Sequence, residues 1–192
     1  MSSSDAHVVV LGAGHAGGTL VALLRQYGFA GPITMVGDEP IAPYQRPPLS
    51  KAWLKGEADE DSLVLKPLEF YAENQIDFRP GVSAVSLKRA DKSVELSDGS
   101  SLSYDILVIA TGMRANKLPL PGAELSGVLS LRSAADAEAL KGHLKPGHHI
   151  AIIGGGYIGL EVAASARALA AIGNPEAVAA VLARERWNTY TP

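Results

Sequence analysis

Residues 8–17 read Val-Val-Val-Leu-Gly-Ala-Gly-His-Ala-Gly, and this stretch decides the fold. Its four leading apolar residues are typical of a strand buried on both faces, as in a parallel sheet. Gly12 permits a tight turn after the strand, Gly14 lets a phosphate approach the backbone, and Gly17 lets the next helix pack closely on the strand. The free N–H groups at the start of that helix would favour a pyrophosphate.

The residues that follow predict a helix and a second strand. The helix has apolar residues at the spacing of one helical face, namely Leu20, Leu23, Leu24 and Tyr27. Gly28 would end it, and residues 33–36 form a second β-rich run. An acidic residue about 20 positions after the glycines is expected to bind a ribose hydroxyl. Asp38 is the first choice for that role, and Glu39 is the alternative.

The same pattern occurs a second time near the end of the chain. Residues 150–153 are apolar, the motif glycines are Gly154, Gly156 and Gly159, and a helix is expected to follow to about residue 171. One such motif is weak evidence, but two copies predict two separate dinucleotides. Two dinucleotides imply hydride transfer from a nicotinamide to a second redox carrier, for which FAD is the natural candidate.

The region between the motifs predicts the rest of an α/β fold. The prolines of residues 40–51 indicate a rigid loop rather than a helix. Residues 68–74 predict a short helix, residues 82–105 an antiparallel meander, and residues 106–110 another apolar strand. Ser133 and Asp136 resemble a capping box that opens a helix.

We therefore expect an α/β fold: a Rossmann-like FAD/NAD(P)-binding domain with a parallel sheet and an antiparallel β-meander, plus a partial second Rossmann unit. The expected domains are residues 1–115, which would bind FAD, residues 116–171, which would begin an NAD(P)-binding domain, and a divergent tail, residues 172–192.

Composition excludes several classes of function. The chain has no cysteine, which excludes disulfides, thiolate metal sites and a catalytic cysteine pair. Its five histidines show no metal-ligand spacing, so no metal is expected. The net charge of −3 argues against nucleic acid as a partner. No run of 18 apolar residues and no signal-peptide core occur, which predicts a soluble, cytoplasmic protein.

Four tracts give the sequence a family resemblance: residues 10–17, 43–51, 107–112 and 154–161. They resemble the glutathione-reductase-like two-dinucleotide flavoproteins, and among these the NADH-dependent ferredoxin, putidaredoxin and rubredoxin reductases. The tract Tyr-Gln-Arg-Pro-Pro-Leu-Ser-Lys at residues 44–51 is the most specific. The resemblance implies electron transfer from NADH through FAD to a ferredoxin-type iron–sulfur protein.

The resemblance also implies roles for individual residues. The residues expected to bind FAD are Gly12, Gly14, Ala16, Gly17, Asp38, Glu39, Arg46, Lys51, Ala84, Thr111, Gly112 and Arg132. Those expected to bind NAD(H) are Gly154, Gly156, Ile158, Gly159 and Glu161. Lys51 and Glu161 are the catalytic candidates, Lys51 near the flavin N5 and Glu161 near the nicotinamide.

Simpler interpretations of these residues remain open. Lys51 would otherwise be a surface lysine, and Arg46 would otherwise bond carbonyls of its own loop. Because there is no cysteine pair, electrons are expected to leave the flavin singly, to an iron–sulfur protein, or to go to oxygen. The alternative functions are an FAD-linked NADH oxidase, a nitrite-reductase-type flavin subunit, and a non-catalytic flavin-binding fragment or one that needs a complementing chain.

After residue 171 the sequence departs from the family pattern. Gly173-Asn174-Pro175 precedes a stretch, residues 176–186, that looks helical. We therefore expect no second strand here and no acid for the NAD ribose. The family's returning FAD segment and its C-terminal domain are also expected to be missing, so that the chain would be C-terminally truncated. Residues 145–192 are accordingly expected to pack poorly.

Overall fold

The structure, a computed structural model, describes residues 5–170 and 180–182. It contains two compact units. The first consists of residues up to Gln45 together with Glu60–Met113, and the second of Arg46–Asp59 together with the residues from Arg114 onward. By packing, therefore, residues 46–59 accompany the second unit; which cofactor each expected domain binds stays a prediction.

The first unit is built on a four-stranded parallel sheet. Its strands are β1 (Val8–Leu11), β2 (Ile33–Gly37), β3 (Ile76–Pro80) and β7 (Ile106–Ile109), in the order β3-β2-β1-β7. Val8 pairs with Ile33 on one side and with Ile106 on the other. Every residue of β1 and β2 is buried, which confirms the predicted two-faced burial.

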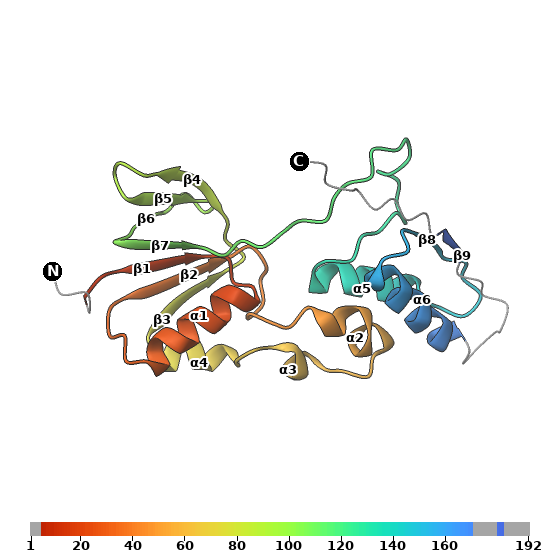
Figure 1. Cartoon of the computed structure of the whole chain (residues 1–192), viewed down its shortest axis with the longest axis horizontal. Coiled ribbons are helices and arrows are strands. Elements are labelled where there is room, and N and C mark those ends of the chain that lie inside the picture. Colours follow the sequence, from red (N-terminus) through yellow and green to blue (C-terminus); the bar gives the residue numbers. More distant parts are fainter. Residues whose placement is uncertain (1–4, 171–179, 183–192) are drawn as a thin grey trace, which may run out of the picture. The chain divides into compact units, whose positions relative to one another are not determined.

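The two faces of this sheet bury different partners (Figure 1). On one face pack α1 (His15–Gln26) and α4 (Leu68–Glu73), where the buried cluster comprises Val8, Val10, Val21, Ile33, Met35, Tyr71 and Ile76. On the other packs the antiparallel sheet of β4 (Ala84–Lys88), β5 (Ser93–Leu96) and β6 (Ser101–Ser103), through Val9, Leu11, Val36, Val94, Leu96 and Leu102. The predicted α/β class and meander are confirmed.

The predicted apolar face of helix α1 is confirmed only in part, since Leu20 and Leu24 pack against the core of the first unit. Leu23 and Tyr27 are 37% and 81% exposed, so their assignment to the buried face is wrong. The buried residues are Gly17, Gly18 and Val21. Gly18 lies against the fully buried Pro43, and only small residues allow the helix this close approach.

The proline-rich tract is also more regular than predicted. Pro47–Ser50 form one 3-10 turn, η1, followed by the short helix α2 (Ala52–Lys55). A loop without helix is therefore wrong for this part. Prolines at the first helical positions fit the required φ and lack N–H groups that would have no partner there. In the first unit, α3 (Glu60–Leu63) supplies one further helical turn.

The second unit packs three helices around a small core. Helix α2 contacts α5 (Ala134–His143) and α6 (Tyr157–Ala170), and its Leu54 is completely buried. The cluster also contains Leu144, Val162 and Ala166. The predicted capping box is confirmed, because Ser133 and Asp136 exchange side-chain and backbone hydrogen bonds. Ile153, Ile158 and Leu160 remain more than half exposed, which agrees with the expected loose packing after residue 145.

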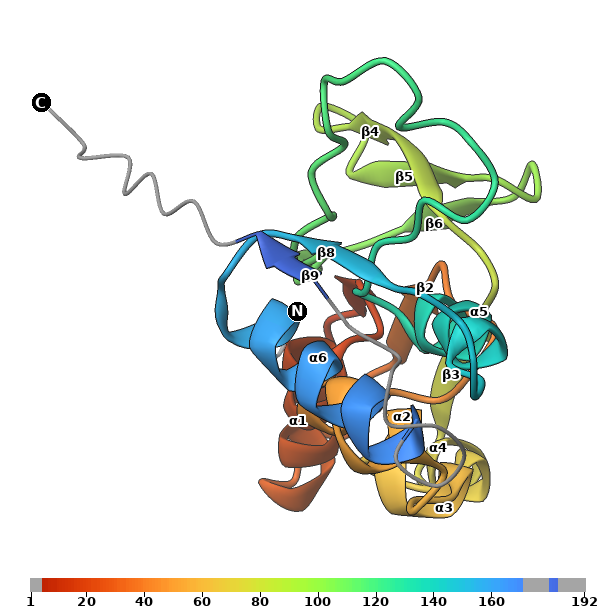
Figure 2. The same ribbon diagram turned by 90° about the vertical axis from the view of Figure 1, so that its right-hand side faces the viewer.

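The expectation of no second strand is wrong. Strand β9 (Ala180–Leu182) pairs in parallel with β8 (Ala151–Ile153), and Figure 2 shows the two side by side. A short apolar run with a central valine suits a strand, and it satisfies backbone groups on one edge of β8. The predicted helix over 176–186 is thus wrong at 180–182. The rest of the tail, including the question of a ribose acid, lies outside the described residues. No helix within the described ranges is long and apolar enough to cross a membrane.

Candidate functional site: two glycine turns and a charged cavity

The first glycine turn has three distinct positions. Gly12 has φ +108°, and a Cβ there would overlap the carbonyl oxygen of Ala110. Gly17 touches the carbonyl oxygen of Gly12, so a side chain would push α1 off the strand. Gly14 has no atom within 4 Å of its Cβ position and is the N-cap of α1, with no side-chain cap and no acidic residue in the first turn. The turn therefore leaves an open space at an uncapped helix N-terminus, where an anion is favoured.

The acidic residues after β2 differ in their surroundings. Asp38 is exposed, whereas Glu39 is half-buried and accepts a hydrogen bond of 2.6 Å from the hydroxyl of Tyr44. Tyr44 is buried, so this bond fixes the position of the Glu39 carboxylate within the first unit. Asp38 is therefore the more accessible of the two carboxylates, and Tyr44, which begins the tract identified as the most specific, was given no role of its own from the sequence.

The other predicted FAD residues of the first unit lie at the same edge of the sheet. The N–H of Ala110 bonds to Leu11, so Thr111 and Gly112 follow β7 next to the Gly12 turn. Val82 donates to the carbonyl of Gly37, which brings the segment leading to Ala84 beside the end of β2. In the sheet order, β2 and β7 lie on opposite sides of β1, which makes the carboxyl end of β1 a topological switch point. Open α/β sheets bind their ligands at such a point.

The second glycine turn repeats the geometry of the first. Gly154 has φ +110°, Gly156 has no atom within 4 Å of its Cβ position, and Gly159 lies against the carbonyl oxygen of Gly154. These three positions match Gly12, Gly14 and Gly17 in order. The first turn of α6 also contains no acidic residue. Both turns are therefore suited to a phosphate.

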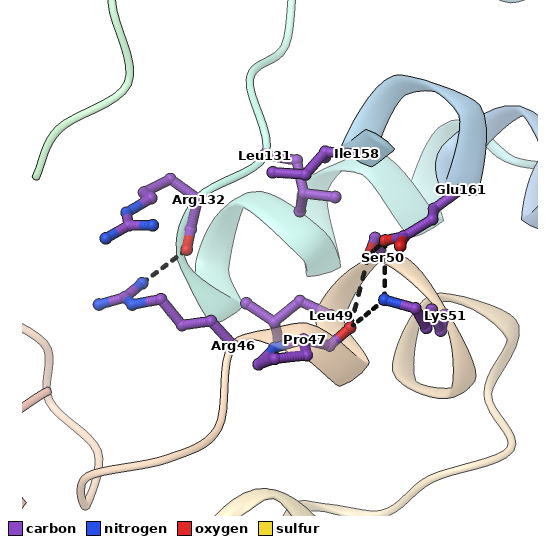
Figure 3. Close-up of a pocket in the computed structure, with 9 residues that line it drawn as sticks. All are labelled: Arg46, Pro47, Leu49, Ser50, Lys51, Leu131, Arg132, Ile158 and Glu161. Atoms are coloured by element: carbon purple, nitrogen blue, oxygen red, sulfur yellow. Dashed lines mark hydrogen bonds and ion pairs between the residues drawn. The ribbon is translucent and has the colours of Figure 1, made fainter. Parts of the chain in front are cut away.

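Five of the predicted residues line one cavity of about 280 Å³ in the second unit (Figure 3). They are Arg46, Lys51, Arg132, Ile158 and Glu161. The remaining lining residues, which the sequence did not single out individually, are Pro47, Leu49, Ser50 and Leu131. The volume suits a ring-sized group rather than a whole dinucleotide.

Lys51 and Glu161 form an ion pair in this cavity. Lys51 Nζ lies 2.8 Å from Glu161 Oε2, and Ser50 Oγ donates to the same oxygen at 2.5 Å. The ammonium of Lys51 and the hydroxyl of Ser50 hold the pKa of the Glu161 carboxyl below its ordinary value. The carboxylate is therefore ionised at neutral pH, beside the ammonium of Lys51.

The two arginines are joined through the main chain. Arg46 Nη1 donates to the carbonyl oxygen of Arg132 at 2.5 Å, and the N–H of Arg132 donates to Asp136 of the capping box at 2.9 Å. The alternative interpretation of Arg46 was a bond to carbonyls of its own loop; this contact instead goes to the carbonyl of a distant segment. The start of α5 in this way fixes one wall of the cavity.

Ser50 is the main residue that the sequence analysis missed. It belongs to the tract of residues 44–51 that was identified as the most specific. A serine directly before Lys51, a catalytic candidate, was a usable signal, but its partner Glu161 is far away in the sequence.

Comparison with known proteins gives the same family as the geometry. The chain matches the pyridine nucleotide-disulphide oxidoreductase family over residues 6–189. It is 50% identical over 163 residues to the probable ferredoxin reductase of Castellaniella defragrans, covering 85% of this chain and 40% of that protein. It is 46% identical over 160 residues to rhodocoxin reductase of Rhodococcus erythropolis, covering 83% and 38%.

A solved structure agrees with these relatives. Putidaredoxin reductase, in its covalent complex with putidaredoxin, superposes with a TM-score of 0.79 at 41% identity, over 85% of this chain and 40% of that one. The resemblance expected from the sequence is confirmed. The chain spans about 40% of the length of these relatives. The match over nearly all of its residues shows that the chain belongs to the pyridine nucleotide-disulphide oxidoreductase family.

Proposed function

We propose that the chain belongs to an FAD-dependent oxidoreductase that passes electrons from NADH, through FAD, to a ferredoxin-type iron–sulfur protein. The observation that carries this proposal is the pair of matching glycine turns, each with an open space at a helix N-terminus. Bound FAD would supply the chemistry, because a flavin accepts a hydride and releases its electrons one at a time.

The residues of the first turn fit a dinucleotide. A diphosphate needs backbone N–H donors and space for its oxygens, and Gly14 and the first turn of α1 provide both. Asp38 would accept hydrogen bonds from a ribose. Ala16, Ala84, Thr111 and Gly112 would complete the FAD site, as the family resemblance implies.

In the second unit we assign NADH to the turn at Gly154, Gly156 and Gly159. Glu161 follows this turn on α6 and faces Lys51, so both side chains would lie near the flavin and nicotinamide rings. The ammonium of Lys51 would stabilise the negative charge of a reduced flavin, and Glu161 would keep the lysine side chain oriented. Arg46 and Arg132 would add positive charge on the opposite wall.

The acceptor is assigned by analogy with the named relatives, two of which are reductases of small redox proteins. A cytoplasmic location is proposed because NADH is supplied there.

The proposal can be tested on the 192-residue chain itself. The chain is mixed with FAD, freed of excess flavin and examined by absorption spectroscopy, and NADH is then added without oxygen. We expect stoichiometric bound flavin and bleaching of its visible band, followed by reoxidation with a ferredoxin. Bound flavin that NADH does not bleach would instead indicate the non-catalytic fragment or the need for a complementing chain. Rapid oxygen consumption without ferredoxin would indicate an NADH oxidase.

A further inference from the structure

We propose that Ser50 is a positioning residue for the Lys51–Glu161 pair, whose hydroxyl fixes the Glu161 carboxylate in the cavity. This inference rests on the proposed function for its consequence, but it stands on contacts within the second unit. Ser50 Oγ and Lys51 Nζ reach the same carboxylate oxygen, Oε2, at 2.5 Å and 2.8 Å. The carboxylate therefore has two donors that come from adjacent residues of one tract.

Of these two donors, Ser50 is held more firmly, although Lys51 Nζ also donates to the carbonyl oxygen of Pro47 at 3.2 Å. Ser50 is only 5% exposed and belongs to the 3-10 turn η1. Its carbonyl oxygen accepts a hydrogen bond of 2.9 Å from Ser165 Oγ, which is itself buried. Ser165 lies four residues after Glu161 on α6, so one face of this helix grips Ser50 at both its hydroxyl and its carbonyl.

Lys51 cannot perform the same task. Its side chain is half exposed, and its ammonium ends a flexible four-carbon stem. An ion pair of this kind is screened by salt and contributes little by itself to fixing a geometry. A short bond from a buried hydroxyl is neutral on the donor side and much less sensitive to salt. Lys51 therefore contributes most of the electrostatic stabilisation of the Glu161 carboxylate, and Ser50 fixes the position of that carboxylate.

The test is the titration of Glu161 by carbon-13 NMR in the full chain, with the carboxyl resonance assigned from Glu161→Gln. In Ser50→Ala, we expect the midpoint to shift upward, because one donor to the ionised form is lost, and to become more sensitive to salt than in the wild type. Ser50→Thr keeps a hydroxyl on the same carbon and should restore both the midpoint and the wild-type salt response. Ser165→Ala is the matched control, because it removes the bond to the Ser50 carbonyl and keeps the Ser50 hydroxyl, so its shift should be smaller than that of Ser50→Ala.

The outcomes separate clearly. An unchanged midpoint and salt response in Ser50→Ala would overturn the proposal. An equal shift in Ser165→Ala would also overturn it, because general loosening of η1 would then explain the result. If Ser50→Ala does not fold, the test rests on Ser50→Thr, and a titration of Glu161 in that variant that differs from the wild type would overturn the proposal. None of these measurements uses FAD or NADH, so a chain that binds neither would refute the proposed function and leave the Ser50 result intact.

Discussion

Replacement of Gly14 by alanine should separate folding from cofactor binding. Its Cβ position is empty to 4 Å, and its backbone is extended with φ −84°, which alanine adopts freely. The structural cost is therefore that of exchanging an N-cap glycine, at most about 1 kcal/mol. For a chain of this length, that corresponds to a fall in melting temperature of roughly 2–4 °C at most.

The same methyl group would occupy the space that we assign to a phosphate. Loss of one charge-assisted hydrogen bond costs about 1.5–3 kcal/mol, which weakens binding by about 10- to 150-fold. The assay is FAD titration by fluorescence quenching, next to thermal unfolding of the cofactor-free protein. Gly156→Ala makes the identical change in the second turn, and it should weaken NADH binding and leave FAD binding unchanged. Wild-type FAD affinity in folded Gly14→Ala, or equal loss of FAD in both variants, would refute the assignment of the two turns.

Three further predictions concern the second unit. Leu54→Ala empties a completely buried position and should destabilise this unit by about 2–5 kcal/mol, seen as faster amide exchange in α5 and α6 and unchanged exchange in β1 and β2. Ser133→Ala removes the cap hydrogen bond to Asp136 and should cost about 0.5–2 kcal/mol in urea unfolding; a smaller loss would show that the capping box is not needed. Because the pKa of Glu161 is lowered in the folded state, its stabilising contribution is complete above the ordinary value of 4.5 and is lost as the pH falls through the folded-state value. Glu161→Gln should therefore lose less stability on acidification than the wild type, and equal acid sensitivity of the two proteins would contradict this.

The sequence predicted those parts of the fold that depend on local backbone demands. A glycine with φ near +110° directly after a strand is a local requirement, so Gly12 and Gly154 could both be identified, although β8, unlike β1, is largely exposed. The capping box of Ser133 was likewise visible, because its two partners are three residues apart. The buried face of α1 could be predicted only in part. Hydrophobicity favours Leu23 and Tyr27, whereas close packing on Pro43 and on the carbonyl of Gly12 selects Gly18 and Gly17.

The cavity depended on contacts that periodicity does not reveal. Arg46, Arg132 and Glu161 come from three distant segments, and the family resemblance implied separate roles for them rather than one shared cavity. The same resemblance raised the expectation that no strand follows α6, because the tail lacks the family's pattern. A run of three residues, Ala180–Leu182, was enough to pair with β8, since the open edge of a strand accepts backbone hydrogen bonds from any sequence that can extend.

Both glycine turns are closed mainly by main-chain atoms, since a carbonyl of Gly12 lies against Gly17 and a carbonyl of Gly154 lies against Gly159. Such a closure is indifferent to the side chains carried by the residues in between. Intervening residues such as His15 and Tyr157 are exposed, so we expect that exchanging them would leave both turns intact. The backbone N–H groups that we assign to the phosphates would keep their positions.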